Sequence, residues 1–334
     1  MPRAVLIGGT GMIGRAAARA LAADGWDVVA VSRSGTLPDG LAELGIESVA
    51  ADREDDAQLR AALGSGADVV YDSVAMNGKH GGQLNRLEGL VGSLVVISTA
   101  SVYADDQGRA FDGEGGELPR LPVPIFETQR TAEPGEATYS MQKADLEQTL
   151  LQGPLPSTLI RACAVYGPGA KNPRELYFVK RAFDGRRRVA ISWNGESRFN
   201  SASVYNLAEL IRLAATQPGD RILNGGDPDP PSTLEISQAI GTALEYEFEP
   251  VLLPAGEFGN PWGVPAESSL IVSMEAAERE LGYRPVTTYP QAVKETCAWL
   301  VAELERGRSW EGSYIADTLD YAAEDEALAS LSRP

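Results

Sequence analysis

Residues 4–21 read AVLIGGTGMIGRAAARAL, and this stretch indicates the fold of the N-terminal part of the chain. The apolar run 4–7 predicts a buried strand, and the alanine-rich run 15–21 predicts a helix. Glycines between a strand and a helix permit positive φ angles and let a ligand approach the backbone closely. Because the free N–H groups and the dipole of the helix favour a phosphate, the stretch predicts a dinucleotide-binding loop.

The loop contains four glycines, and their spacing can be parsed in two ways. Gly9, Gly11 and Gly14 give Gly-x-Gly-x-x-Gly, whereas Gly8, Gly11 and Gly14 give Gly-x-x-Gly-x-x-Gly. In both, the last glycine lets the helix pack closely on the sheet. We expect the loop and the first helical turn to bind the cofactor through Gly8, Thr10, Gly11, Met12, Ile13 and Gly14.

The rest of the first half alternates strand and helix patterns. Strands are expected at residues 3–8, 27–33, 46–51, 67–75, 93–99 and 157–165. Helices are expected at residues 12–24, 55–63, 83–92 and 139–152. Several of the strands are almost wholly apolar, as in a parallel sheet that helices cover on both faces. The predicted fold class is therefore α/β, with a Rossmann-type doubly wound parallel sheet.

The remaining segments are less regular. Residues 104–138 hold four prolines and many acids, and a connection of this length predicts the rim of a functional site. After residue 166 the pattern is mixed, which predicts a smaller mixed α/β C-terminal domain. In the chain after residue 166, helices are expected at 174–185, 206–217, 232–245, 273–281 and 289–306, and strands at 188–193, 221–225 and 247–253. Residues 311–334 form an acidic extension, either docked or loose.

Composition excludes several classes of partner. The 334 residues carry a net charge of −18, which disfavours nucleic acid and anionic membranes. Two cysteines, Cys163 and Cys297, and a single histidine, His80, give no disulfide framework, no Ser-His-Asp triad and no expected metal site. His80 lies in a glycine-rich run and is expected in a loop. Without a signal segment or an apolar membrane span, we expect a cytoplasmic protein.

The end of the second strand bears on the choice of cofactor. In NAD sites an acidic residue about 20 positions past the glycines holds the ribose 2′-hydroxyl. Here the strand ends in Ser32 and Arg33, which can bind a 2′-phosphate through charge-assisted hydrogen bonds. We therefore predict NADP(H) as the favoured cofactor, with NAD(H) as the alternative.

Tyr139 and Lys143 open a predicted helix, four residues apart and on one helical face. A nearby ammonium favours phenolate, so we expect a lowered tyrosine pKa and proton exchange with a carbonyl or carbinol oxygen. Lys143 is also placed to bind the nicotinamide ribose. Thr99 stands at the carboxyl end of the fifth strand, where ligands bind in open α/β sheets, and is expected to hold the reacting oxygen.

Together these motifs resemble an extended short-chain dehydrogenase/reductase of the NAD-dependent epimerase/dehydratase family. The resemblance also rests on four further matching segments: Val102-Tyr103, the run 165–169 (VYGPG), the run 280–285 (ELGYRP) and Trp299. It implies that Thr99, Tyr139 and Lys143 are the catalytic residues. It further implies that Lys143 and five other residues contact the cofactor: Asp52, which would contact the adenine, and Ser73, Val74, Ala75 and Ser98.

The resemblance also implies a division into domains. Residues 1–165 with about 200–225 would form the Rossmann domain, and residues 166–199 with about 226–310 the substrate domain. The substrate would be a small molecule held mainly by residues after 166, and a homodimer is favoured.

Three departures from the family pattern bear on the reaction. Ala164 stands where nucleotide-sugar enzymes carry asparagine, Ala100-Ser101 replaces the Asp-Glu pair of dehydratases, and Arg198 is displaced from the diphosphate site. We therefore expect an NAD(P)-dependent reductase or dehydrogenase that acts on a carbonyl or alcohol of a small molecule. A nucleotide-sugar epimerase with a modified pocket and a non-catalytic NAD(P)-binding sensor are the alternatives.

Overall fold

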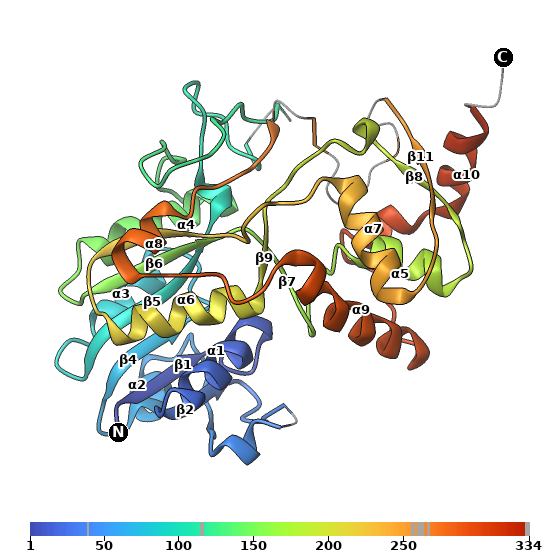
Figure 1. Ribbon diagram of the computed structural model, residues 1–334. Coiled ribbons are helices and arrows are strands. Elements are labelled where there is room, and N and C mark those ends of the chain that lie inside the picture. Colours follow the sequence, from blue (N-terminus) through green and yellow to red (C-terminus); the bar gives the residue numbers. More distant parts are fainter. Residues whose placement is uncertain (39, 114–116, 255–257, 259–263, 266–267, 331–334) are drawn as a thin grey trace.

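The computed structural model describes residues 1–38, 40–113, 117–254, 258, 264–265 and 268–330. A seven-stranded parallel sheet is its centre, with the strand order β10-β6-β5-β4-β1-β2-β3 (Figure 1). The strands are β1 (Arg3–Ile7), β2 (Asp27–Ser32), β3 (Glu47–Ala50), β4 (Ala67–Asp72), β5 (Val91–Thr99), β6 (Ser157–Ala162) and β10 (Arg221–Gly225). The order reverses between β1 and β4, which opens a crevice at their carboxyl ends. The predicted doubly wound α/β fold is confirmed.

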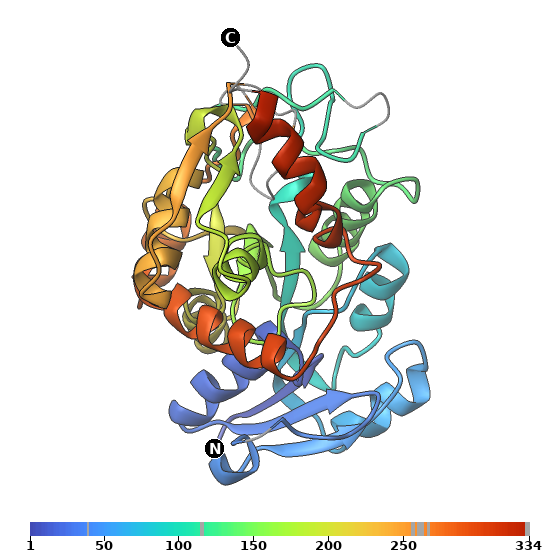
Figure 2. The same ribbon diagram turned by 90° about the vertical axis from the view of Figure 1, so that its right-hand side faces the viewer.

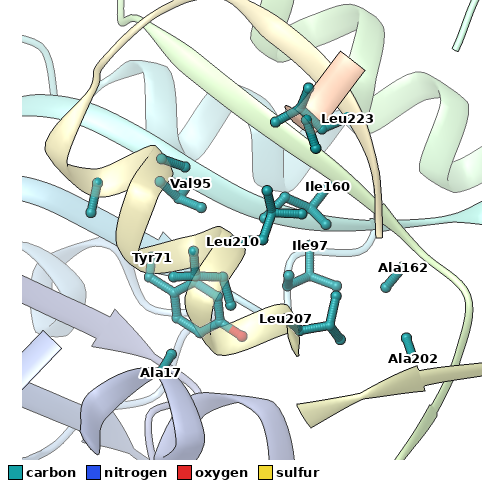
Figure 3. Close-up of a cluster of buried hydrophobic side chains, with 14 of the residues drawn as sticks. Ala17, Tyr71, Val95, Ile97, Ile160, Ala162, Ala202, Leu207, Leu210 and Leu223 are labelled. Atoms are coloured by element: carbon teal, nitrogen blue, oxygen red, sulfur yellow. The ribbon is translucent and has the colours of Figure 1, made fainter. Parts of the chain in front are cut away.

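Helices cover both faces of this sheet. One face packs against α1 (Met12–Ala23), α6 (Val204–Thr216) and α8 (Glu275–Leu281). The other packs against α2 (Asp56–Leu63), α3 (Gly78–Asn85) and α4 (Tyr139–Leu151). Figure 3 shows Leu207 and Leu210 of α6 facing Tyr71 and strand residues of β5 and β6. Burial on both faces explains why the strands are almost wholly apolar.

A second group of elements has its own apolar core. It contains α5 (Leu176–Phe183), α7 (Thr233–Leu244), α9 (Tyr289–Glu305), α10 (Tyr321–Ser330) and the strand pair β8 (Arg188–Ile191) with β11 (Glu249–Leu252). A short pair, β7 (Ala164–Tyr166) with β9 (Ser201–Ser203), joins it to the sheet region. Figure 2 shows these elements beside the central sheet. The domain boundaries expected above remain predictions.

Two local expectations were wrong. The helix predicted at 83–92 is α3, which begins at Gly78, and residues from Val91 onward belong to β5. Asn77 starts α3 by accepting a hydrogen bond from the His80 N–H, so His80 is helical and not in a loop. A Cβ at position 81 would lie 3.0 Å from the Thr149 side chain of α4, so glycine there permits a close approach of the two helices. A glycine-rich run therefore forms a helix through its packing.

The C-terminal extension is docked. Its helix α10 packs against the second core through Leu328, and its Glu324 is fully buried.

No helix in the described part of the chain combines the length and apolar character that a membrane span requires.

Candidate active site

The glycine loop follows β1 in a conformation that only glycine fits. Gly8 has a φ of +81°, and a Cβ there would lie 2.5 Å from the Ser73 Oγ. A Cβ at Gly14 would lie 2.1 Å from the carbonyl oxygen of Gly8. The first helical turn of α1 therefore sits directly on the loop, as inferred for the last glycine.

The N-terminus of α1 is open to an anion. Gly11 is the N-cap residue, no side chain caps the helix, and its first turn contains no acidic residue. The first N–H groups of a helix have no acceptor within the helix, so they are free for a phosphate. The loop and helix therefore fit the diphosphate of a dinucleotide.

One cleft of about 960 Å³ brings most of the predicted cofactor residues together. Those that line it are Gly8, Thr10, Gly11, Met12, Ile13, Ser32, Arg33, Asp52, Ser73 and Val74. Tyr139 lines the same cleft. Gly14, Ala75, Ser98, Thr99 and Lys143 are not among its lining residues. The cleft is also lined by six residues that no sequence motif indicated, namely Arg53, Glu54, Lys171, Asn172, Arg174 and Tyr314.

Ser32 and Arg33 lie at the carboxyl end of β2. The Ser32 hydroxyl accepts a hydrogen bond from the Gly35 N–H at 3.1 Å. Arg33 is exposed, and within the described residues its guanidinium forms no hydrogen bond or ion pair. Asp52 caps the turn that follows β3 by accepting from the Glu54 N–H at 3.0 Å. The cleft therefore has an unpaired cation at its β2–β3 end.

A buried ion pair shapes the end of β4. The Asp72 carboxylate accepts from the Val74 and Ala75 N–H groups, both at 2.8 Å, and pairs with Arg53 at 2.6 Å. Arg53 also donates to Gln83 Oε1 at 2.6 Å. The pair fixes the loop that carries Val74 into the cleft. The position of Asp72, a charged residue at the end of the apolar run 67–72, could have indicated from the sequence that it belongs to the site.

Tyr139 and Thr99 lie together. Thr99 ends β5, and its Oγ1 accepts from the Ser101 N–H at 3.2 Å. Tyr139 is the first residue of α4, which Thr138 caps. The Tyr139 and Thr99 side chains lie close enough together for Thr99 to act on the pKa of Tyr139. This arrangement brings a phenol and an alcohol to the same point of the cleft edge.

Lys143 lies behind Tyr139. Its Nζ is 5.9 Å from the centroid of the Tyr139 ring and donates to the carbonyl oxygens of Ala75 (2.7 Å) and Ile97 (2.9 Å). Lys143 thus ties α4 to the ends of β4 and β5.

The pKa values of these groups follow from burial. Burial lowers the pKa of Lys143 to about 8, against the opposing charges of Asp72 and Glu147. Although 44% of Tyr139 is exposed, partial burial raises its pKa, and the proximity of Thr99 acts in the opposite direction. The expected lowering of the tyrosine pKa is therefore wrong for this arrangement, because burial has the largest effect and raises the pKa.

The segment 104–138 contacts the start of α4, but none of its described residues lines the cleft, so its role as a functional rim stays a prediction. The Asp112 carboxylate accepts from the Ser140 N–H at 2.8 Å and so holds the start of α4. Phe111 packs edge-on against Phe199, with ring centroids 5.7 Å apart. The segment therefore links Tyr139 to the C-terminal elements.

Ser98 has a different environment from the one expected. It is buried, and its hydroxyl donates to Glu147 Oε1 at 2.5 Å. Glu147 is in turn paired with Arg161 at 2.7 Å. Within the described residues Ser98 therefore belongs to a buried network beside the site, and its hydroxyl does not face the cleft.

Comparison with known proteins agrees with this arrangement. The family model of the NAD dependent epimerase/dehydratase family matches residues 4–226, about two thirds of the chain. The fold is that of an extended short-chain dehydrogenase/reductase, and the chain belongs to the NAD dependent epimerase/dehydratase family, a family of enzymes. A comparison with curated proteins finds no match.

Solved structures share the fold over most of the chain. A UDP-glucose 4-epimerase from Stenotrophomonas maltophila, solved with bound NAD and formylated UDP-arabinopyranose, has a TM-score of 0.72 and 19% identity, covering 92% of this chain and 100% of that one. An epimerase from Methanothermobacter thermautotrophicus has a TM-score of 0.70 and 19% identity, covering 91% and 94%. A UDP-N-acetylglucosamine 4-epimerase from Bacillus cereus has a TM-score of 0.69 and 18% identity, covering 90% and 99%.

Proposed function

We propose that the protein is an NADP(H)-dependent oxidoreductase that interconverts a carbonyl and an alcohol of a small molecule. The observation that supports this proposal is the proximity of the Tyr139 and Thr99 side chains at the edge of the cleft that contains the glycine loop. A phenol and an alcohol held together can contact one substrate oxygen from two sides.

The proposed roles follow from the positions of the side chains. A bound nicotinamide supplies or accepts the hydride at the substrate carbon. In the direction of reduction, the Tyr139 hydroxyl gives its proton to the carbonyl oxygen, and Thr99 orients that oxygen. Lys143 fixes α4 through its two carbonyl contacts and, as an ammonium, makes Tyr139 a stronger acid.

The preference for NADP(H) is a further part of the proposal. Arg33 is exposed at the end of β2 without a carboxylate partner among the described residues, and a guanidinium of this kind suits a 2′-phosphate.

We also place the protein in the cytoplasm, because both of its cysteines are buried and unpaired.

A nucleotide-sugar epimerase is the second candidate, because the structures compared above include enzymes of that name with TM-scores up to 0.72. Ala164 and the displaced Arg198 oppose this alternative, since both positions would contact a nucleotide sugar in the family pattern. An epimerase would retain its cofactor through each turnover and would bind a uridine diphosphate sugar.

The Tyr139→Phe variant tests the proposed chemistry. We expect it to bind NADPH as the parent does and to lose at least about 100-fold in kcat for carbonyl reduction, because the proton donor is absent. The measurement is NADPH oxidation with a panel of small aldehydes and ketones. Full turnover in Tyr139→Phe, or UDP-sugar epimerisation without any carbonyl reduction by the parent, would contradict the proposal.

A further inference from the structure

Arg174 stands at the other end of the same cleft from Arg33. Arg33 follows β2, whereas Arg174 follows β6 and β7, across the crevice between β1 and β4. The Arg174 guanidinium lies 5.7 Å from the ring centroid of Phe199 and 5.7 Å from that of Tyr314. Both distances are within the range of about 6 Å for a cation–π contact, so two aromatic rings hold the guanidinium.

No carboxylate among the described residues forms an ion pair with Arg174, although its charge acts on the neighbouring Glu175 carboxyl. Its side chain forms no hydrogen bond or ion pair within the described part of the chain, and its Nε is buried without an acceptor. The adjacent carboxyl of Glu175 is buried and accepts from the Tyr289 hydroxyl at 3.5 Å. Other arginines of this acidic protein, such as Arg161 and Arg181, pair with carboxylates. An unpaired guanidinium in a cleft is available to an anion from solution.

Tyr314 reaches the cleft from the C-terminal extension. The extension is fixed by the pair between Arg181 of α5 and Glu324 of α10, both fully buried and 3.0 Å apart. Glu324 also accepts from the Ala190 N–H at 3.0 Å. Tyr314 and Glu324 lie outside the segment 4–226 that the family model matches. The extension therefore adds its own side chain to the wall of the cleft.

Phe199 is held by a further aromatic contact. Its ring packs against Phe111, which belongs to the segment that caps α4 through Asp112. A continuous row of Phe111, Phe199, Arg174 and Tyr314 thus runs from the catalytic helix to the extension. These contacts restrict the orientation of the Arg174 guanidinium in the cleft.

We propose that Arg174 binds an anionic group, a carboxylate or a phosphate, on the substrate, and that Tyr314 and Phe199 are positioning residues for this guanidinium. The proposal deepens the function proposed above and rests on it, because it takes the β6–β7 end of the cleft as the substrate end. A planar guanidinium binds either anion through two parallel hydrogen bonds, so the substrate class is an acidic carbonyl compound or its alcohol.

The test uses phenyl phosphate, benzoate and neutral benzamide as probes of the purified protein, titrated calorimetrically with and without NADP⁺. We expect at least one anion to bind about tenfold or more tightly than benzamide, and Arg174→Gln to abolish that difference. Arg174→Lys should retain part of the affinity, because it keeps the charge without the planar fork. Comparison of benzoate with phenyl phosphate distinguishes a carboxylate from a phosphate ligand.

Variants at position 314 separate positioning from folding. We expect Tyr314→Ala to weaken anion binding several-fold and Tyr314→Phe to restore it, with benzamide binding and the melting temperature unchanged in both. Arg188→Gln is the matched control, since Arg188 is exposed and lies outside the cleft lining.

Two results would overturn the inference. If neither anion binds better than benzamide, Arg174 is not an anion-binding residue. If Arg174→Gln loses affinity for NADPH as well, Arg174 is a cofactor residue. Failure of the parent to bind NADPH would instead refute the proposed function, and the titrations without cofactor would still decide the role of Arg174.

Discussion

At the scale of single residues, Lys143 connects the burial of the site to its chemistry. Its ammonium is enclosed between α4 and the ends of β4 and β5, and burial lowers its pKa to about 8. Asp72 and Glu147 oppose this shift, and Arg53 adds to it. Lys143 is therefore protonated below about pH 8 and increasingly neutral above it.

This pKa gives a pH dependence with a definite sign. A protonated Lys143 favours the tyrosinate that is left after proton transfer, so Tyr139 is the stronger acid at low pH. We expect kcat/KM for carbonyl reduction to fall as the pH rises through about 8. The measurement is the pH–rate profile, with NADPH affinity over the same range as the control. A flat profile across that pKa would mean that the Lys143 charge does not assist Tyr139.

Some site residues were predictable from the sequence and others were not. Tyr139 and Lys143 are four residues apart, and the loop glycines lie within one turn, so local spacing was enough to find them. The pairs Arg53–Asp72 and Arg174–Tyr314 join residues from distant segments. Contacts of that kind arise only from tertiary packing, and no local pattern in a single sequence predicts them.

At the scale of elements, tertiary packing determined the secondary structure where the local sequence led to a wrong prediction. The helix α3 forms across a glycine-rich run because its glycines allow close contact with α4. In contrast, the strands β1 to β6 and the helix α1 matched their predictions, since their apolar periodicity is strong. The extension carried no comparable signal, and its docking depends on buried side chains such as Glu324, Leu328 and Ile315.

Two glycine-to-alanine variants test this view of packing. A Cβ at Gly14 would lie 2.1 Å from a backbone oxygen, whereas the nearest atom to a Cβ at Gly82 is the end of Arg86 at 3.7 Å. We expect Gly14→Ala to cost about 1–3 kcal/mol of unfolding free energy and to impair NADPH binding. Gly82→Ala, the matched control, should be neutral or gain roughly 0.5–1 kcal/mol. Denaturant unfolding measures both, and an unperturbed Gly14→Ala would refute the loop geometry.

The docking of α10 gives a second pair of variants. Glu324→Gln leaves Arg181 buried without a counter-charge, which we expect to cost about 3–5 kcal/mol or to release the extension. Asp325→Asn removes the more exposed partner of Arg186 and should cost about 0–1 kcal/mol. Hydrogen exchange of residues 311–330 distinguishes release from global destabilisation. Equal protection in both variants would show that the buried pair does not hold the extension.

At the scale of the whole molecule, the charge distribution explains how an acidic protein can bind an acidic cofactor. The net charge of −18 repels anions in general, yet the cleft contains two guanidinium groups, Arg33 and Arg174, that lack carboxylate partners among the described residues. One faces each end of the crevice between β1 and β4. The overall fold was predictable because alternating strands and helices allow few arrangements, whereas the substrate end depends on chain segments without a motif.

The most direct test of the central claim is a fluorescence titration of the purified protein and of Arg33→Gln with NADPH and with NADH. We expect the parent to bind NADPH about tenfold or more tightly than NADH, and Arg33→Gln to lose this preference while its NADH affinity is unchanged. A parent that prefers NADH, or that carries a cofactor through purification, would contradict the NADP(H) reductase and favour an epimerase. Binding of neither cofactor would refute the dinucleotide cleft itself.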